Sequence, residues 1–196
     1  MTKAPSPKVL NFIRHAPSEP SGYLYGRTDA DIGRIESSVA KKLHELIGPV
    51  GLVLASPAKR CQKTCDSILS LDHDRLTEDN LWEQSFGTWD GLAFSELPDI
   101  GLLSDDALAS FAAPDGESFV DLSKRVHSTL SELCQTRAEE HLTFFVHAGV
   151  IRAALAFAFR NHSAALKCEI DTLSLTRLRY LGDEGFSVMT VNQTVK

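Results

Sequence analysis

The sequence predicts an α/β fold with a largely parallel central sheet. Short apolar segments typical of buried strands alternate along the chain with longer amphipathic segments typical of helices. The strand-like segments are residues 9–13 (VLNFI), residues 50–55 (VGLVLA) and residues 142–146 (LTFFV). Because strands that are joined through helices pair in parallel, this alternation favours a mostly parallel sheet.

Two amphipathic segments are the clearest predicted helices. In residues 34–47 the apolar side chains fall on one helical face, and Gly48 with Pro49 ends the helix. The same spacing recurs in residues 119–133. The side chains on these two faces are Ile35, Val39, Leu43 and Leu46, and then Phe119, Leu122, Val126, Leu130 and Leu133.

Ser56 and Pro57 predict the start of another helix directly after the second strand. Serine is a favoured N-cap and proline is favoured at the first helical position. We expect this helix to continue to about residue 69. The remaining predicted elements are a helix and two closing strands, over residues 150–159, 172–181 and 186–192.

Residues 17–33 and 81–92 are predicted loops. The first is rich in Pro, Gly, Ser and Asp, and the second carries aromatic residues and glycines without clear periodicity. Long loops in compact domains are usually functional. Residues 98–117 form a predicted lid-like insertion with a short helix and a Pro-Asp-Gly turn. Since no repeat or linker divides the chain, residues 1–196 are predicted to be one domain.

The overall charge bears on the kind of partner. The net charge is -6 and the pI is about 5.6. A negative protein repels nucleic acid and anionic membrane surfaces, and no dense stripe of lysine and arginine offsets that repulsion. We therefore expect no nucleic acid and no membrane among its partners. A pocket lined by a few arginines can still bind a small anion.

The cysteines and the N-terminal segment indicate a cytoplasmic location. The four cysteines form no CxxC pair, and two of them share a face of a predicted helix, as packing residues would. The first 12 residues lack the apolar core of a secretory signal. A reducing compartment is the simplest interpretation. The cysteines are Cys61, Cys65, Cys134 and Cys168.

Each of the three apolar strands ends in polar residues that can carry chemistry. In open α/β sheets, ligands bind beyond the carboxyl ends of the strands. We therefore expect two histidines and two arginines around one crevice. In chain order, the residues at these strand ends are Arg14, His15, Ser56, Arg60 and His147.

These side chains suit the transfer of a phosphoryl group. Arginine presents a planar fork of donors that binds phosphate oxygens. Neutral imidazole is a nucleophile near pH 7, and a second histidine can stabilise charge on the transferred group. The departing alkoxide needs a proton, and Glu83 is the candidate acid, although another carboxylate could serve. His147 could instead be a hydrogen-bonded core histidine.

Other residues near these motifs have either a role at the site or a structural role. Arg27 lies in the loop after His15 and either reaches the substrate or stays at the surface. Arg152 is expected to have a structural role beneath His147. The two tryptophans are expected to pack rather than to serve as platforms for a ligand; they are Trp82 and Trp89.

Ordered motifs along most of the chain resemble the histidine phosphatase (phosphoglycerate mutase-like) superfamily. A lone Arg-His pair would be a weak signal, but an ordered series of blocks is hard to reach by chance. The blocks are FIRHA at 12–16, YGRTDADI at 25–32, ASPAKRCQKT at 55–64, LWEQSFGTWDG at 81–91, DGESFVDLSKRV at 115–126 and VHAGVIR at 146–152.

The resemblance implies a fold, a reaction and roles for particular residues. The fold would be a three-layer α/β/α sandwich of the phosphoglycerate mutase-like type. His15 would be the phosphorylated nucleophile, and Glu83 would donate a proton to the leaving group and later activate water. No metal or cofactor is implied. The phosphate pocket would be formed by Arg14, Arg60 and His147.

The sequence departs from the family pattern at a few positions. Glycine usually follows each of the two histidines, whereas Ala16 and Ala148 stand there in this chain. A methyl group is tolerated at such positions if φ is negative, so we expect slight crowding. Ser21 takes the place of a frequent asparagine, in a shortened loop interrupted by prolines.

The leading functional hypothesis is a phosphomonoesterase that acts on a small molecule. The short chain and the GYLYGRTD loop at 21–28 look most like the α-ribazole phosphatase branch of the superfamily. The alternatives are a phosphoglycerate mutase, an idle phospholigand-binding protein and a metallohydrolase using both histidines with Glu83. Paired arginines would repel a cation, which disfavours the metallohydrolase. The oligomeric state stays open, a homodimer included.

Overall fold

A six-stranded sheet organises the described part of the chain. The structure is a computed structural model that describes residues 7–69 and 74–195. The strand order is β5-β4-β6-β1-β7-β8. The strands are β1 (Lys8–Arg14), β4 (Leu52–Ala55), β5 (Arg75–Thr77), β6 (His141–Val146), β7 (Leu175–Tyr180) and β8 (Phe186–Gln193).

The prediction of a mostly parallel sheet is confirmed. Strands β5, β4, β6 and β1 pair in parallel, whereas β7 and β8 pair antiparallel at the other edge. The two closing strands lie close to their predicted ranges. Strand β5 was not predicted, because its three residues are mostly exposed and have no apolar pattern.

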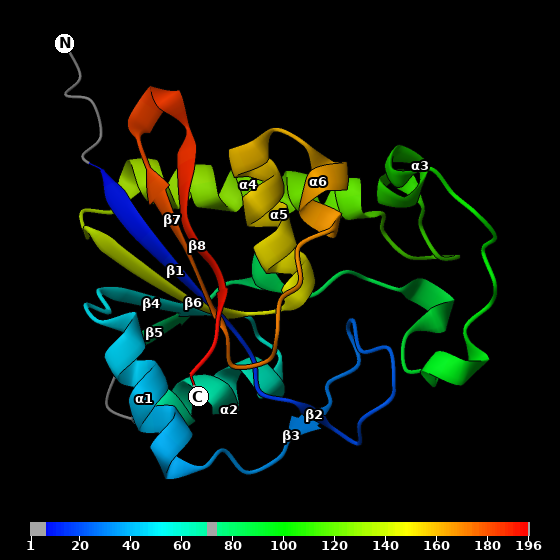
Figure 1. Cartoon of the computed structure of the whole chain (residues 1–196), viewed down its shortest axis with the longest axis horizontal. Helices are drawn as coiled ribbons and strands as arrows, with labels where there is room; N and C mark the ends of the chain where they lie inside the picture. The colour runs from blue at the N-terminus through cyan, green and yellow to red at the C-terminus, as the bar shows by residue number, and fades with distance from the viewer. Residues whose placement is uncertain (1–6, 70–73, 196) are drawn as a thin grey trace.

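Helices cover both faces of the sheet, so the three-layer α/β/α sandwich is also confirmed (Figure 1). One face carries α1 and α2, and the opposite face carries α4, α5 and α6. The first two helices are α1 (Ser37–Ile47) and α2 (Lys59–Leu69). The other three are α4 (Phe119–Thr136), α5 (Ala148–Phe159) and α6 (His162–Leu166).

The apolar runs of the strands explain why both faces need a cover. Successive side chains of a strand point to opposite faces. Phe12 and Phe144 therefore join the core beneath α4 and α5, where their rings stack with centroids 4.8 Å apart. Ile13 and Phe145, one residue later on each strand, join the core beneath α1 and α2. A strand that is buried on both faces reads as a continuous apolar run.

The predicted start of α2 is wrong by a few residues. The regular helix begins at Lys59, so Pro57 does not occupy its first turn. The Ser56 hydroxyl accepts only a long hydrogen bond of 3.4 Å from the N–H of Ala58. Ser56 turns instead toward His147, whose ring it contacts at 2.8 Å.

Short ordered elements occupy the predicted loops. The first loop contains the paired strands β2 (Ser18–Glu19) and β3 (Asp31–Ile32). The aromatic loop and its flanks contain η1 (Asp79–Leu81), η2 (Gly87–Trp89) and η3 (Phe94–Glu96), and a tight turn before β8 contains η4 (Gly182–Glu184). Elements of two or three residues have no hydrophobic periodicity, so the sequence offers no signal for them.

The insertion at 98–117 contains the helix α3 (Asp105–Ser110). Asp105 forms an ion pair with Lys167 at 2.5 Å, and Asp106 accepts a hydrogen bond from Ser163. These contacts attach α3 to the region of α6. The lid-like role of the insertion and the single-domain organisation of residues 1–196 stay predictions.

In the part of the chain that the structure describes, no helix has both the length and the apolarity needed to cross a membrane.

Candidate active site

The carboxyl ends of three parallel strands bring the two histidines together. β1 ends at Arg14, and the N–H of His15 continues its ladder by donating to the carbonyl of Val146 at 2.9 Å. Val146 is the last residue of β6, so His147 follows on the neighbouring strand. The two imidazole rings meet edge to face, with centroids 5.2 Å apart.

His15 is held in one tautomer by its own backbone. Its Nδ1 lies 2.7 Å from the carbonyl oxygen of Ala16. A carbonyl only accepts, so Nδ1 carries the proton and Nε2 keeps its lone pair. Burial, together with the nearby charges of Arg60 and Arg14, lowers the pKa of His15 to about 3. The ring is therefore neutral at pH 7 and has a free nucleophilic nitrogen.

His147 is completely buried behind His15 and has the opposite tautomer. The Nε of Arg60 donates to Nδ1 of His147 at 3.3 Å, so Nε2 carries the proton and donates to the Ser56 hydroxyl at 2.8 Å. Burial lowers the pKa of His147 well below its usual value, with Arg60 and His15 as further causes. The ring of Trp82 lies parallel to that of His147.

Arg60 holds the first loop with its guanidinium group. This side chain is completely buried. Its Nη1 donates to the carbonyl of Thr28 at 2.9 Å, and its Nη2 donates to the carbonyls of Gly26 at 2.8 Å and Tyr25 at 3.4 Å. Arg60 therefore links the loop, the helix α2 and His147.

Arg14 has free hydrogen-bonding capacity beside His15. Its Nη1 donates to the carbonyl of Ile170 at 2.5 Å, whereas its buried Nε has no hydrogen-bond partner among the described residues. Burial lowers the pKa of Arg14, and the carboxylate of Glu83 opposes that change. A buried N–H without a partner is costly, and an anionic oxygen would satisfy it.

Glu83 is held by two backbone N–H groups, one at the start of α5 and one from the next residue of its own loop. Gly149 donates to its Oε2 at 3.2 Å, and Gln84 donates to its Oε1 at 3.0 Å. A Cβ atom at position 149 would lie 2.2 Å from Oε1 of Glu83, so only glycine fits there without a shift. Gly149 received no role from the sequence, although it lies in the VHAGVIR motif.

Arg125 and Glu117 fix the backbone on both sides of Glu83. Arg125 donates to the carbonyls of Asn80 at 2.5 Å and Glu83 at 3.0 Å. It also donates to the Glu117 carboxylate at 2.6 Å and 3.1 Å, and that carboxylate accepts from the N–H of Ser85 at 2.9 Å. The sequence reasoning missed both roles, although both residues lie in the DGESFVDLSKRV motif.

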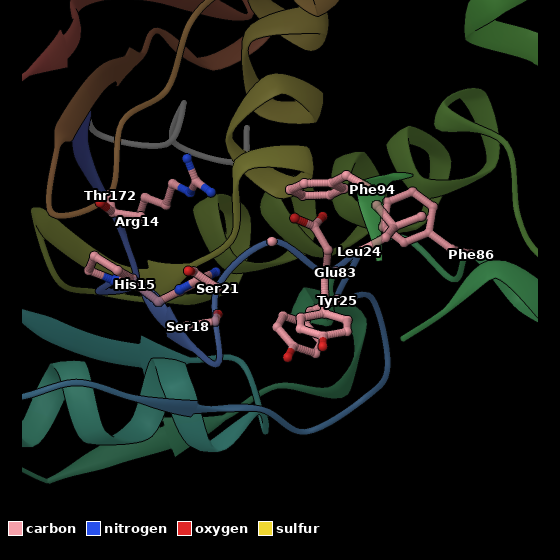
Figure 2. Close-up of a pocket in the computed structure, with 13 residues that line it drawn as sticks. Arg14, His15, Ser18, Ser21, Leu24, Tyr25, Glu83, Phe86, Phe94 and Thr172 are labelled. Atoms are coloured by element: carbon pink, nitrogen blue, oxygen red, sulfur yellow. The ribbon is translucent and has the colours of Figure 1, made fainter. Parts of the chain in front are cut away.

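A cavity of about 310 Å³ collects part of the predicted site (Figure 2). Four of the predicted residues line it, namely Arg14, His15, Ser21 and Glu83. Ser18 and Thr172 are further polar lining residues that the sequence did not single out.

The other predicted site residues do not line this cavity. Arg60 and His147 lie completely buried in the wall behind His15. Arg27 lies outside, with its guanidinium 5.6 Å from the centre of the Trp82 ring and its Nη2 3.8 Å from Oε1 of Glu117. Arg152 donates from Nε to the carbonyl of Cys168 at 2.9 Å, in agreement with a structural role.

The two alanines that replace family glycines fit their backbone positions. Neither Ala16 nor Ala148 adopts a positive φ, so the methyl groups cause no backbone strain. Ala16 is buried, and its N–H donates to the Thr64 hydroxyl at 2.9 Å. Ala148 begins α5.

The chain resembles a known protein family and curated proteins of mycobacteria. The model of the histidine phosphatase superfamily (branch 1) matches residues 10–194. A bifunctional protein of Mycobacterium tuberculosis is 30% identical over 155 residues, which cover 75% of this chain and 42% of that protein. An uncharacterized protein of Mycobacterium bovis gives the same values. The chain thus spans about two fifths of the length of these curated relatives.

Solved structures of phosphatases share the fold at low sequence identity. A mycobacterial glucosyl-3-phosphoglycerate phosphatase has a TM-score of 0.82 at 18% identity, covering 96% of this chain and 100% of that one. A putative α-ribazole-5'-phosphate phosphatase from Escherichia coli has a TM-score of 0.77 at 21% identity, covering 96% and 99%. A phosphoserine phosphatase from Entamoeba histolytica has a TM-score of 0.79 at 21% identity, covering 94% and 96%.

The match of the family model extends over nearly the whole chain and includes every motif discussed above. The chain therefore belongs to the histidine phosphatase superfamily.

Proposed function

We propose that this chain hydrolyses small-molecule phosphomonoesters through a phosphohistidine intermediate on His15. One observation carries the proposal. The Nδ1–H group of His15 is bound to the carbonyl of Ala16, which leaves Nε2 as a free nucleophile in a cavity shared with Arg14 and Glu83. The same cavity thus holds a nucleophile, a cation for the phosphate and a carboxyl group for the leaving oxygen.

In the first step, Nε2 of His15 attacks phosphorus and the bond between phosphorus and the leaving oxygen breaks. Protonated Glu83 gives its proton to that oxygen, and the alcohol departs. In the second step, the Glu83 carboxylate takes a proton from water while the water oxygen attacks phosphorus. The bond between phosphorus and Nε2 breaks, inorganic phosphate forms, and His15 returns to its neutral state.

Arg14 is proposed to bind the phosphate through its unpaired Nε, and Ser21 is proposed to add a hydrogen bond from the loop that follows His15. We also propose that Arg60 and His147 belong to the phosphate site and form its wall behind His15. For direct contact, the Nε2–H group of His147 has to exchange the Ser56 hydroxyl for a phosphoryl oxygen. Contact between Arg27 and the substrate stays a prediction.

The finer proposal for the substrate is α-ribazole 5'-phosphate. The support is the GYLYGRTD loop, together with a fold shared with the putative α-ribazole-5'-phosphate phosphatase of Escherichia coli. We also propose a cytoplasmic location, because all four cysteines are free thiols and three of them are buried. A homodimer stays a prediction.

The test is phosphate release from a panel of phosphomonoesters that includes α-ribazole phosphate and 3-phosphoglycerate. The proposal expects release by the wild-type protein and a loss of at least about 1,000-fold in the folded His15→Ala variant. Isomerisation of phosphoglycerate without phosphate release would show a mutase instead. Intact ligand binding without turnover on any ester would show an idle binding protein.

A further inference from the structure

One side of the cavity is lined by aromatic and aliphatic side chains. In Figure 2 Phe86, Phe94 and Tyr25 gather on one side of the view, and Arg14 and His15 lie on the other. A leaving group that extends from a phosphate at His15 past Glu83 would contact this wall. The wall consists of Tyr23, Leu24, Tyr25, Phe86 and Phe94.

This aromatic wall is built by backbone hydrogen bonds between two distant segments. Leu24 donates to the carbonyl of Leu92 at 2.9 Å, and Phe94 donates to the carbonyl of Gly22 at 2.9 Å. An isolated antiparallel bridge at Tyr23 lies between these two bonds. These bonds join the backbones of the first loop and of the segment after the aromatic loop into one wall.

Two rings of this wall keep much of their surface uncovered. Phe94 is 58% exposed and Tyr23 is 39% exposed, although both line the cavity. Exposed apolar surface around a cavity marks a place where an apolar group can bind. Aromatic rings also stack with flat partners, which adds to the gain from burial.

The described side chains of the aromatic wall include no cation that could bind a second negative charge on the substrate. Among the described residues that line the cavity, Arg14 is the only lysine or arginine, and it lies beside His15. Glu83 is negative when ionised and lies near Phe94 and Tyr25 in Figure 2, so it would repel an anion at this wall. Arg27 is engaged outside the cavity by Trp82 and Glu117. A carboxylate on the leaving group would lose water without gaining a cation.

We propose that the aromatic wall is the leaving-group subsite, and that the substrates are phosphomonoesters of alcohols that carry a flat aromatic group and no second anionic group. This inference rests on the proposed function, since it places the phosphate at His15. It assigns specificity to Phe94 and Tyr23, and it disfavours phosphorylated acids as substrates.

The test uses phosphonates, because they bind without being hydrolysed. Calorimetry compares benzylphosphonate, ethylphosphonate and 3-phosphonopropionate, which have an aromatic, a small apolar and an anionic group respectively. The expected affinity for benzylphosphonate is about 10-fold or more above that for ethylphosphonate, and 3-phosphonopropionate is expected to bind more weakly than ethylphosphonate. Equal affinities, no detectable binding of benzylphosphonate, or a preference for 3-phosphonopropionate would overturn the inference.

Matched variants locate the preference on the wall. In Phe94→Ala the ratio of benzylphosphonate to ethylphosphonate affinity is expected to fall about fivefold or more. Phe159→Ala removes an equally large ring that is 41% exposed at the end of α5, and its ratio is expected to match the wild type. An unchanged ratio in Phe94→Ala would overturn the inference. Melting temperatures verify that both variants are folded.

The outcomes of the binding test and of the hydrolysis test distinguish a failure of the leaving-group subsite from a failure of the proposed function. A preserved aromatic preference without hydrolysis that depends on His15 would contradict the proposed function alone. Hydrolysis that depends on His15, with equal affinities for the three phosphonates, would contradict the leaving-group subsite alone.

Discussion

The backbone N–H of Gly149 donates to Oε2 of Glu83 at 3.2 Å, at the first turn of α5. The first N–H groups of a helix have no partner within the helix and can therefore bind a side-chain oxygen. The missing side chain at position 149 is what allows this approach, because a Cβ atom would lie 2.2 Å from Oε1 of Glu83. The position of the proposed acid therefore depends on a glycine.

Gly149→Ala is expected to displace Glu83 from the helix terminus. The new methyl group would also lie 2.9 Å from Cδ2 of Leu122, so little room exists on the other side. Hydrolysis of ethyl phosphate, a poor leaving group, is expected to fall about 10- to 100-fold, and that of 4-nitrophenyl phosphate far less. The measurement is kcat/KM for the two esters.

Glu83→Gln provides the comparison for that variant. Glu83→Gln is expected to lower kcat/KM for ethyl phosphate selectively, as Gly149→Ala does. The variant that carries both changes is expected to lose little more activity than Glu83→Gln alone, because both changes act on the Glu83 carboxyl group. Equal losses on both esters would show that Glu83 is not the acid. Fully additive losses would show that Gly149 acts elsewhere.

Arg125→Met is expected to loosen the backbone that presents Glu83. The change removes the donors to the carbonyls of Asn80 and Glu83 and leaves the partly buried Glu117 without its main cation. We expect a loss of about 2–3 kcal/mol in the free energy of unfolding, together with a selective loss of activity on ethyl phosphate. Urea denaturation and the two-ester comparison measure these effects.

Arg177→Met is the matched control for Arg125→Met. Arg177 also binds a side chain and two carbonyls, namely Asn11 at 2.7 Å and both Leu46 and Ile47 at 3.0 Å. It lies on β7 and does not line the cavity. We expect a similar loss of stability and an unchanged ratio between the two esters. A shift of that ratio in both variants would show a general effect of destabilisation.

The pKa of His15 predicts how stability changes with pH. Burial lowers this pKa from 6.5 in the unfolded chain to about 3 in the folded protein. Between these pH values the unfolded chain binds a proton that the folded chain excludes, so stability rises with pH. The contribution is fully present above pH 6.5 and is lost as the pH falls toward 3.

Urea denaturation between pH 4 and pH 8 checks this expectation. The unfolding free energy of the wild type is expected to decline more steeply below pH 6.5 than that of His15→Gln, which has no proton to bind at this position. Identical slopes in the two proteins would show that His15 titrates in the folded state near its ordinary pKa.

Much of the fold was predictable because the central strands are buried on both faces. The segments around Phe12, Leu54 and Phe144 read as continuous apolar runs, and each is followed by polar residues. Since parallel strands end at one edge, the approach of His15 to His147 followed from the sequence. The roles predicted for Arg14 and Glu83 came from side-chain chemistry and from the family motifs, and these roles stay predictions.

The remaining features depend on tertiary contacts that no local pattern contains. The hydrogen bonds from Arg60 to carbonyls of the first loop were not predicted, and its role in the phosphate pocket stays a prediction. The hydrogen bond from Arg125 to the carbonyl of Glu83 joins residues that are 42 positions apart in the sequence. The aromatic wall likewise joins Tyr23 to a segment far along the chain. Each of these depends on side-chain direction, which periodicity does not give.

The most direct test of the account is the detection of phosphohistidine on His15. The wild-type protein is mixed with a hydrolysable ester, quenched in alkali to preserve phosphohistidine, digested and examined by mass spectrometry. We expect a phosphoryl group on His15 that forms at least as fast as turnover and is absent from His15→Ala. A phosphoryl group on another residue, or wild-type hydrolysis by folded His15→Ala, would contradict it.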